Sequence, residues 1–301
     1  MLDKIALVIP VHNRRETTLR ALRSLRRINT DGLEVKIVVV DDGSTDGTSE
    51  AISVEFPEVE LLCGDGTLHY AAGTNRGISA ALEWGSDYLV TMNDDAIFHE
   101  DFLVRLVATA RSSGRTIIGS MLLLWDTPHR VFQVDPQWQP FRGGWVFPEG
   151  MTAFSAPRDP FEVECLVGNC VLFPVQAIRE NGFMDEKTFA NGWGDAQYTA
   201  RMRRAGWKLL VDPISKVWCE PNTYPTPLHR LPKSKALGVL LSDQRHPANL
   251  RRQFQALWHS GPTKLGALVA FASYTAGLAL KALRVIPYAE RRKPNLITSA
   301  Q

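Results

Sequence analysis

Short apolar runs alternate with amphipathic segments through the first 120 residues, and this alternation constrains the fold more than any other feature. The apolar runs fall at residues 4–11, 35–40, 59–63, 88–92 and 116–119. Segments with helical periodicity separate them, at residues 14–28, 47–54, 71–84 and 101–112. Strand and helix in strict alternation predict an α/β fold with a Rossmann-like, mostly parallel sheet and helices on both faces. The β-branched run at residues 36–40 fits a strand covered on both sides.

Each of the first four predicted strands is followed by a polar segment. These segments are Pro10–Arg14, Asp41–Gly47, Gly64–Leu68 and Asn93–Asp95. Ligands of parallel sheets bind beyond the carboxyl ends of the strands, so we expect one site along this edge. Neither GxGxxG nor GxxxxGK[ST] follows the first strand, which argues against a dinucleotide-binding domain and a P-loop protein.

Two pairs of adjacent carboxylates stand at these strand ends. Asp94 and Asp95 would repel each other unless a cation or hydrogen-bond donors lay between them, and their oxygens suit Mg²⁺ or Mn²⁺ completed by substrate phosphates. The alternative is a solvated loop with an aspartate cap. Asp41 and Asp42 suit a hydrogen bond to a base imide or a ribose hydroxyl, with ordinary turn chemistry as the alternative.

Two glycine-rich segments lie close to the predicted site. Residues 64–73 hold more glycine than a turn requires, and Gly66 suits a backbone that approaches a phosphate or a sugar closely. A plain turn into the next helix is the alternative. Residues 192–194 precede a helix predicted for residues 195–205. Trp193 is a candidate to stack on a sugar ring, with core packing as the alternative.

Five segments taken together resemble the motifs of family 2 glycosyltransferases. They are Ile9–Arg14, Val40–Asp46, Asn75–Gly77, Asn93–Asp95, and Gly192–Asp195 followed by Arg201 and Gly206. Their order and spacing match over about residues 4–220. The resemblance implies a GT-A fold, a nucleotide-diphosphate sugar donor, a divalent metal and inversion at the anomeric carbon.

The resemblance also implies roles for individual residues. Those expected to line the nucleoside pocket are Pro10, His12, Asn13, Asp41 and Asp42, with Asp42 as the base contact. Further substrate-binding candidates are Gly66, Asn75, Arg76, Asn93, Asp94, Trp193 and Gly194. Asp95 is expected to bind the metal, and Asp195 to act as the general base that deprotonates the acceptor. An N-cap is the alternative for Asp195.

The chain departs from the family pattern at several positions. Gly194 and Gln197 stand where the family usually has acidic residues beside the base, and Thr74 replaces a frequent arginine. Trp218–Glu220 stand where a histidine often serves as a metal or phosphate ligand. Residues that could compensate are Arg76, Cys219, Glu220 and His229.

Charge divides the chain into two unequal parts. Residues 1–228 hold 22 Lys and Arg against 30 Asp and Glu, whereas residues 229–301 hold 12 against 2. We therefore predict a catalytic domain at 1–228, with a nucleotide-sugar half at about 1–120 and an acceptor half at about 121–228, and a basic helical tail at 229–301. The tail's apolar segment, residues 265–280, is short for a bilayer span and suits a helix lying on an anionic membrane, with packing on the domain as the alternative.

The middle of the chain is harder to assign. Residues 164–173 look like a strand, and the cysteines within them look like small buried hydrophobes. The four cysteines form no CxxC pair, and the first apolar run resembles a strand rather than a signal peptide. A cytoplasmic protein, peripheral at the inner face of the membrane, is therefore expected.

These observations favour an inverting glycosyltransferase that acts on a saccharide or lipid-linked saccharide in surface polysaccharide assembly. A nucleotidyltransferase and a catalytically silent sugar-nucleotide binder are the alternatives. The first would need a glycine-rich, basic loop after strand one, and the second would not need the carboxylates that are present. Nucleic acid is not expected as a partner, because long apolar runs separate the basic residues of the tail. UDP, GDP and dTDP sugars all remain open as donors.

Overall fold

The computed structural model describes residues 2–190, 192–221, 226, 228–243 and 246–282. Its first half contains β1 (Asp3–Val11), α1 (Arg15–Leu25), β2 (Leu33–Asp41), α2 (Thr48–Glu55), β3 (Glu60–Cys63), α3 (His69–Glu83), β4 (Tyr88–Thr91), β5 (Ala96–Phe98), α4 (Phe102–Ser113) and β6 (Thr116–Leu124). Then follow β7 (Gln137–Gln139), η1 (Pro140–Arg142), β8 (Gly144–Val146), β9 (Phe161–Glu162), β10 (Val171–Pro174), α5 (Val175–Asn181), α6 (Gly194–Arg204), β11 (Lys208–Cys219), η2 (Leu228–Arg230), α7 (Lys233–Leu241), α8 (Leu250–Ser260) and α9 (Lys264–Ala282). Apart from β5, which the apolar periodicity does not predict, the helices and strands of the first half lie close to their predicted positions.

One nine-stranded sheet organises the molecule. Its order is β3-β2-β1-β4-β10-β6-β11-β5, and β9 pairs with β11. The strands β3, β2, β1 and β4 are parallel, as are β6 and β11, whereas β10 is antiparallel to both of its neighbours. This arrangement confirms the predicted α/β class with a mostly parallel central sheet.

The core forms around the first strand. Residues 5–9 of β1 are fully buried, since neighbouring strands lie on both sides of it and α3 packs over it. Gly77 of α3 makes this packing close, because a Cβ there would overlap Val8 Cγ1. The tight fit between α3 and β1 fixes the position of the loops that precede and follow the helix.

The strand predicted at residues 164–173 is wrong over its first seven residues. The strand begins only at Val171, because the backbone of the preceding segment is not extended and bonds to residues outside the sheet ladder. Gly168 N–H donates to a side chain of α6, and Cys170 has a φ of 84°, which an extended strand does not allow. The apolar character of this segment reflects burial rather than extended structure.

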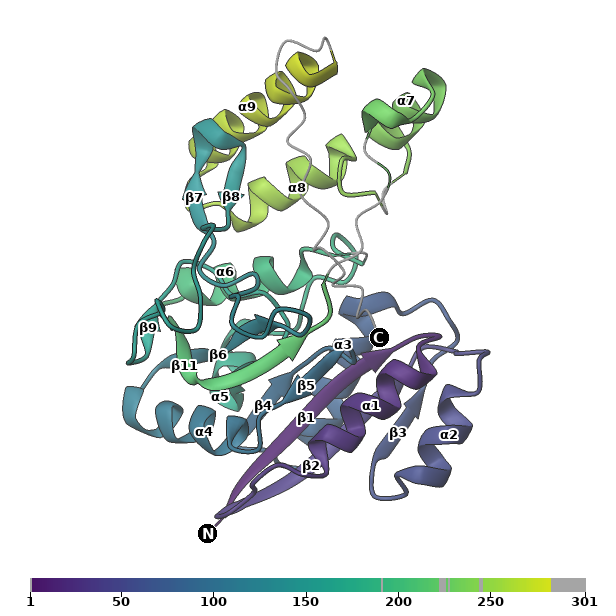
Figure 1. Ribbon diagram of the computed structural model, residues 1–301, viewed down its shortest axis with the longest axis vertical. Helices are drawn as coiled ribbons and strands as arrows, with labels where there is room; N and C mark the ends of the chain where they lie inside the picture. Colours follow the sequence, from purple (N-terminus) through teal and green to yellow (C-terminus); the bar gives the residue numbers. More distant parts are fainter. Residues whose placement is uncertain (1, 191, 222–225, 227, 244–245, 283–301) are drawn as a thin grey trace, which may run out of the picture.

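The C-terminal helices lie over one end of the sheet domain. Figure 1 shows α7, α8 and α9 gathered with the β7–β8 hairpin at the end of the molecule opposite the N-terminus. There α8 packs on α6 and α9 packs on η1 and β8, around a small cluster of Leu257, Ala267 and Ala270. The alternative considered for the tail was packing on the domain. The contacts of α8 and of one face of α9 agree with that alternative.

The outer surface of α9 remains partly apolar. Leu265 is 73% exposed and Leu268 is 49% exposed. Among the helices of the described residues, none combines the length and the apolar character needed to cross a bilayer. The basic cluster of the tail, Arg284 and Arg291–Lys293, lies outside the described residues.

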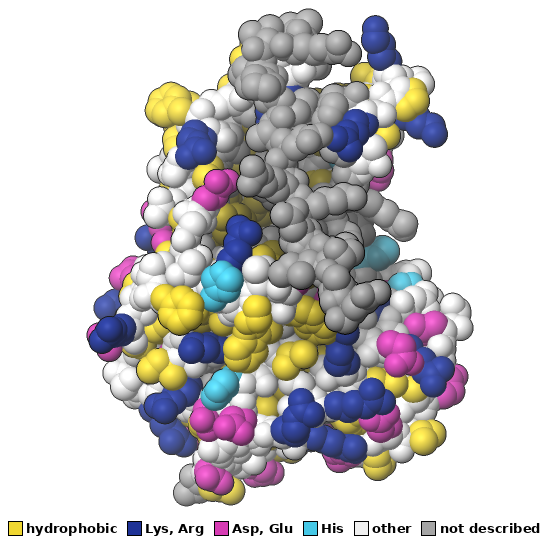
Figure 2. All heavy atoms as spheres, in the orientation of Figure 1, with side chains coloured by type: hydrophobic (Ala, Val, Ile, Leu, Met, Phe, Trp, Pro, Cys, Tyr) yellow, Lys and Arg dark blue, Asp and Glu magenta, His cyan; other side chains and the backbone are white. Residues whose placement is uncertain are grey.

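Charged side chains cover the opposite end of the molecule. Figure 2 shows Lys and Arg beside Asp and Glu over the lower part of this face. Two ion pairs link α1 and the residue after it to α2 and the turn that follows α2: Arg23 Nε lies 2.6 Å from Glu55 Oε1, and Arg26 Nε lies 2.7 Å from Glu58 Oε1. Since these pairs are solvent-exposed, each adds little to the stability of the fold.

Candidate active site

The polar segments after β1 and β2 meet at the carboxyl edge of the sheet. Val11 at the end of β1 pairs with Asp41 at the end of β2. The His12 ring donates from Nδ1 to the Asp42 carbonyl oxygen at 2.6 Å, and Asn13 Oδ1 accepts the Thr45 N–H at 2.7 Å. These two segments thus form one continuous wall beside Pro10, where the nucleoside pocket is predicted.

Both carboxylates after β2 hold neighbouring loops in place. Asp41 is buried and accepts hydrogen bonds from the Ser44 N–H at 3.0 Å and from the Ser49 hydroxyl. Asp42 is also buried and accepts three backbone N–H bonds from the glycine-rich loop, namely from Gly66 at 2.9 Å, Leu68 at 3.1 Å and His69 at 2.8 Å. The loop therefore folds around Asp42, and the base contact of this residue stays a prediction.

Gly66 has a conformation that the loop requires. Its φ is +91°, which residues with a Cβ rarely adopt. A Cβ at Gly43 would lie 2.7 Å from the Gly66 nitrogen, so the two loops touch through their backbones. The glycine content suggested that this backbone lies close to a phosphate or a sugar. In the structure the glycines allow the two loops to pack closely against each other.

Arg14, to which the sequence motifs gave no role of its own, joins the acidic residues after β4. Arg14 Nη1 lies 3.2 Å from Asp94 Oδ1 and 3.3 Å from Asp95 Oδ2, and its Nη2 lies 3.6 Å from Glu220 Oε2. Arg14 is the last residue of the Ile9–Arg14 motif, and its place at a strand end was the signal that could have identified it. Arg14 brings positive charge to the point where the predicted site concentrates negative charge.

The pKa of Asp94 reflects this environment. Asp94 is buried, and burial is the main cause that raises the pKa of its carboxyl to about 6. The Arg14 guanidinium lowers this pKa and the Asp95 carboxylate raises it, both to a smaller extent. The Thr18 hydroxyl donates to Asp94 Oδ2 at 3.1 Å. Both carboxylate oxygens of Asp94 therefore have a protein partner, Arg14 at Oδ1 and Thr18 at Oδ2.

Asp95 retains a free oxygen that fits a metal ion. Its Oδ1 is buried and has no hydrogen-bond partner in the described structure, and the same holds for Asn93 Oδ1. Mg²⁺ is usually bound by one or two carboxylates together with substrate phosphates. No group of three His, Cys, Asp or Glu side chains in the described part of the chain is placed to hold a metal by itself. The residues therefore fit a metal shared between Asp95 and a bound diphosphate.

Glu220, one of the proposed replacements for the family histidine, does lie in this cluster. Its carboxylate contacts Arg14 and also Arg20 Nη2, at 2.5 Å. The Arg20 guanidinium in turn stacks over the Trp125 ring, 3.8 Å from its centroid. Cys219 is buried, and burial raises the pKa of its thiol. The side chain of His229 lies outside the described part of the structure.

Asp195 lies in the first turn of α6 with its carboxylate fixed at both oxygens. Oδ2 accepts the Gly168 N–H at 2.6 Å and Oδ1 accepts the Ala196 N–H at 2.8 Å. Burial raises the pKa of Asp195, and these hydrogen bonds oppose the shift. The N-cap alternative is wrong, since Trp193 occupies the cap position, with a φ of 67° and no side-chain cap bond. The strained backbone at Trp193 turns the chain so that Asp195 faces residue 168.

Asn75, Arg76 and Gly194, which were also predicted to bind substrate, differ in burial and in their contacts. The Asn75 amide is buried and bonds to Met184 N–H and C=O and to Glu186, so its hydrogen bonds link α3 to the loop before α6. Arg76 is exposed to solvent. Gly194 is buried where α6 begins, and a Cβ there would make ordinary contacts of 3.6 Å. A direct substrate contact of these residues stays a prediction.

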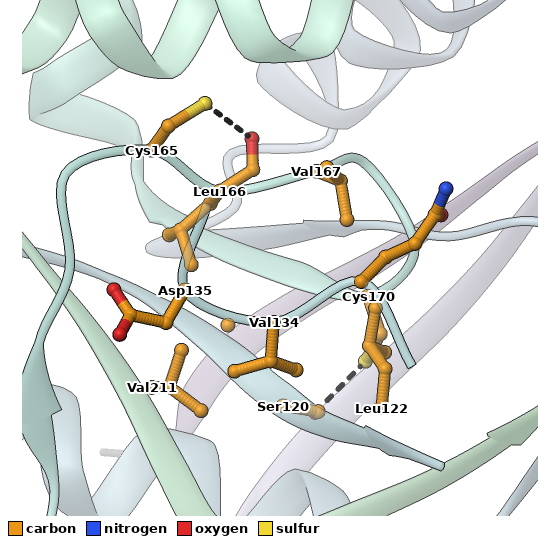
Figure 3. Close-up of a pocket in the computed structure, with 11 residues that line it drawn as sticks. Ser120, Leu122, Val134, Asp135, Cys165, Leu166, Val167, Cys170 and Val211 are labelled. Carbon is orange, nitrogen blue, oxygen red and sulfur yellow. Dashed lines mark hydrogen bonds between the residues drawn. The ribbon is translucent and has the colours of Figure 1, made fainter. Parts of the chain in front are cut away.

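A small cavity near this edge is lined by the residues before β10. Figure 3 shows Cys165, Leu166, Val167 and Cys170 around it, with Ser120 in hydrogen-bond contact with Cys170. Its volume is about 10 Å³, room for about one water and too little for a sugar. Both cysteines are buried, which confirms that they act as small hydrophobes, and burial raises the pKa of each to about 12.

The sheet has the GT-A fold, which glycosyltransferase structures share. Two solved structures share the fold: GalNAc-T7 with UDP, GalNAc and Mn²⁺, with a TM-score of 0.60 and 15% identity, and S. aureus TarS 1-349 with UDP, with a TM-score of 0.54 and 12% identity. The matches cover 95% and 97% of this chain, and 58% and 76% of those chains.

Sequence comparison places the chain within this class more narrowly. The model of glycosyl transferase family 2 matches residues 6–178, and the chain belongs to that family. Succinoglycan biosynthesis protein ExoA of Rhizobium meliloti is 27% identical over 218 residues, which are 70% of this chain and 62% of that protein. The N-acetylglucosaminyl-diphospho-decaprenol L-rhamnosyltransferase of Mycobacterium tuberculosis is 28% identical over 204 residues, 61% of this chain and 66% of that protein. The chain thus spans less than two thirds of the length of either relative.

Proposed function

We propose that this chain is an inverting glycosyltransferase that moves a sugar from a nucleotide-diphosphate sugar to a hydroxyl of a saccharide or lipid-linked saccharide. The proposal depends most on the hydrogen bonds of two adjacent residues, Gly168 and Asn169. Gly168 N–H donates to Asp195, and Asn169 Oδ1 accepts a hydrogen bond from Asn93 Nδ2. The proposed base and the proposed metal loop are therefore tied to one short segment, which supports a shared role in one reaction.

The geometry supports a single displacement. The acceptor oxygen bonds to the anomeric carbon while the bond from that carbon to the phosphate oxygen breaks. Asp195 takes the acceptor proton, and the electron pair of the broken bond leaves with the nucleoside diphosphate. A divalent metal held by Asp95 and the diphosphate would stabilise the charge of this leaving group. The guanidinium of Arg14, beside Asp94 and Asp95, adds fixed positive charge at the same place.

Several features support a lipid-linked acceptor at a membrane surface, in the assembly of cell-surface polysaccharide. Residues 229–301 carry 12 Lys and Arg against 2 Asp and Glu, and Leu265 and Leu268 of α9 are exposed. A basic, partly apolar segment of this kind binds anionic membranes. One relative is named for a diphospho-decaprenol substrate and another for succinoglycan biosynthesis. The enzyme would then act as a peripheral protein at the cytoplasmic face.

A nucleotide panel tests the proposed function. We expect one of UDP, GDP and dTDP to raise the melting temperature, more so with Mn²⁺, and the matching nucleotide sugars to be slowly hydrolysed. Pyrophosphate release from a nucleoside triphosphate and a sugar phosphate would instead indicate a nucleotidyltransferase. Binding without any hydrolysis or transfer would indicate a silent binder, and no binding would contradict all three.

We also expect transfer to fall as the pH is lowered through the pKa of Asp195. Only the ionised carboxylate can accept the acceptor proton, and burial raises this pKa above the ordinary value of 3.8. Loss of rate on acidification should therefore begin at a higher pH than for an exposed aspartate. The measurement is kcat/KM against pH, with nucleoside-diphosphate affinity measured over the same range as a control. An acidic limb at or below pH 3.8 would contradict a raised pKa at the base.

A further inference from the structure

The hydroxyl of Tyr70 is a buried group that the proposed displacement does not use. Tyr70 lies in the first turn of α3, directly after the loop that Asp42 holds. Its hydroxyl oxygen is buried and has no hydrogen-bond partner within the described residues. Burial is the main cause that raises the pKa of Tyr70. The negative charges of Asp195 and Asp95 raise it further, and an interaction with the Thr74 side chain lowers it. The phenol therefore stays protonated and lies within electrostatic reach of both carboxylates.

Gly168 defines where this hydroxyl lies. A Cβ at Gly168 would overlap the Tyr70 hydroxyl oxygen and would lie 3.1 Å from Asp195 Oδ2. Both oxygens therefore face the same side of Gly168, yet they form no hydrogen bond with each other in the described structure. Any side chain at residue 168 would displace one of them.

An unpaired buried hydroxyl is unfavourable for folding, because it loses its hydrogen bonds to water without replacing them. If Tyr70 served only to fill the core, phenylalanine would fill the same space without this cost. A buried hydroxyl that forms no hydrogen bond within the described residues, beside the proposed base, is instead suited to a ligand that supplies the missing hydrogen bond.

We propose that the Tyr70 hydroxyl hydrogen-bonds a hydroxyl group of the transferred sugar. This inference rests on the proposed function, in which the acceptor lies at Asp195 and the diphosphate lies at Asp95. The sugar that passes from one to the other must occupy the space between them. The Tyr70 hydroxyl lies on the same side of Gly168 as Asp195 Oδ2, and a neutral phenol both donates to and accepts from a neutral sugar hydroxyl.

Tyr70→Phe tests the proposal by separating the sugar from the nucleotide. With the nucleoside diphosphate and nucleotide sugar found in the panel, and with Mn²⁺ present, we expect the nucleoside diphosphate to bind as before. We expect the nucleotide sugar to bind about tenfold more weakly, as loss of one hydrogen bond gives. Tyr88→Phe is the matched control, because Tyr88 begins β4, at the opposite end of that strand from Asn93–Asp95. It should change neither affinity.

Deoxy-sugar nucleotides provide a second measurement, which begins with the wild-type protein. One deoxy donor, which lacks the contacted hydroxyl, should bind wild type about tenfold more weakly and bind Tyr70→Phe no more weakly than the parent donor does. If every deoxy donor bound Tyr70→Phe more weakly than the parent donor does, the loss of affinity from the variant and that from the donor would be independent, and the proposal would be overturned. So would unchanged binding of the nucleotide sugar, or equal loss for both ligands, in Tyr70→Phe. Failure of wild type to bind any nucleotide would instead contradict the proposed function.

Discussion

Turnover of the Asp195→Asn variant is expected to be about 10²- to 10⁴-fold lower than that of the unchanged protein, the usual effect of losing a general base. An amide cannot take the acceptor proton, whereas the carboxylate of Asp195 is fixed at the site by Gly168 and Ala196. Donor affinity should hardly change, because the acceptor proton moves only in the transition state. Single-turnover rates at saturating donor, with nucleotide affinity measured separately, give the result.

Structural loss must be separated from chemical loss in this variant. An asparagine can accept only one of the two backbone N–H bonds that Asp195 accepts, so a lower melting temperature is expected as well. Asp212→Asn is the matched control, since the buried Asp212 carboxylate also accepts a backbone N–H, from Ile214 at 2.9 Å, and has no role in the proposed site. Turnover near that of wild type in Asp195→Asn would place the base elsewhere, with Asp185 and Glu186 the next candidates. Glu186 already bonds to Asn75, which makes it the weaker of the two.

The sheet is predictable from the sequence because burial on both faces leaves a local signature. Runs of β-branched residues such as Val38–Val40 are fully buried. These runs alternate with segments of helical periodicity along the chain. The convergence of Asp41, Asp42 and Asn93–Asp95 on one edge follows from the parallel direction of the strands. The strand-end motifs alone therefore indicate the position of the candidate site.

Other parts of the site depend on contacts between distant residues, which no local pattern encodes. Arg14 joins Asp94 and Asp95 from about 80 positions away, through a side chain that looks like any basic residue at a helix start. Asp42 lies at the predicted edge, but its three bonds to the loop at 66–69 depend on how that loop folds back. Residues 164–170 have the composition of a strand and are bent by their bonds to α6 and β4.

The Asp95→Ala variant should lose transfer almost completely, by about 10³-fold or more, because stabilisation of the leaving diphosphate by a metal contributes several kcal/mol. It should also lose the additional stabilisation that Mn²⁺ gives to the nucleotide-bound protein. Nucleotide binding without metal should persist, since Asp41 and Asp42 lie on a different strand end. Melting temperatures with nucleotide, with and without Mn²⁺, test the metal independently of catalysis.

The fold should survive this substitution, which makes the test informative. Arg14 loses one carboxylate partner but keeps Asp94 at 3.2 Å and Glu220 at 3.6 Å, so its charge is not left unpaired. The Asp95 oxygen proposed to bind the metal has no hydrogen-bond partner in the described structure, so its removal breaks no hydrogen bond there. Thr18→Val is a matched control, because it removes the bond to Asp94 and leaves Asp95 in place. If Mn²⁺ stabilised nucleotide-bound Asp95→Ala as much as wild type, or if wild type were fully active in excess chelator, the charge on the leaving group would have to be met by Arg14 alone.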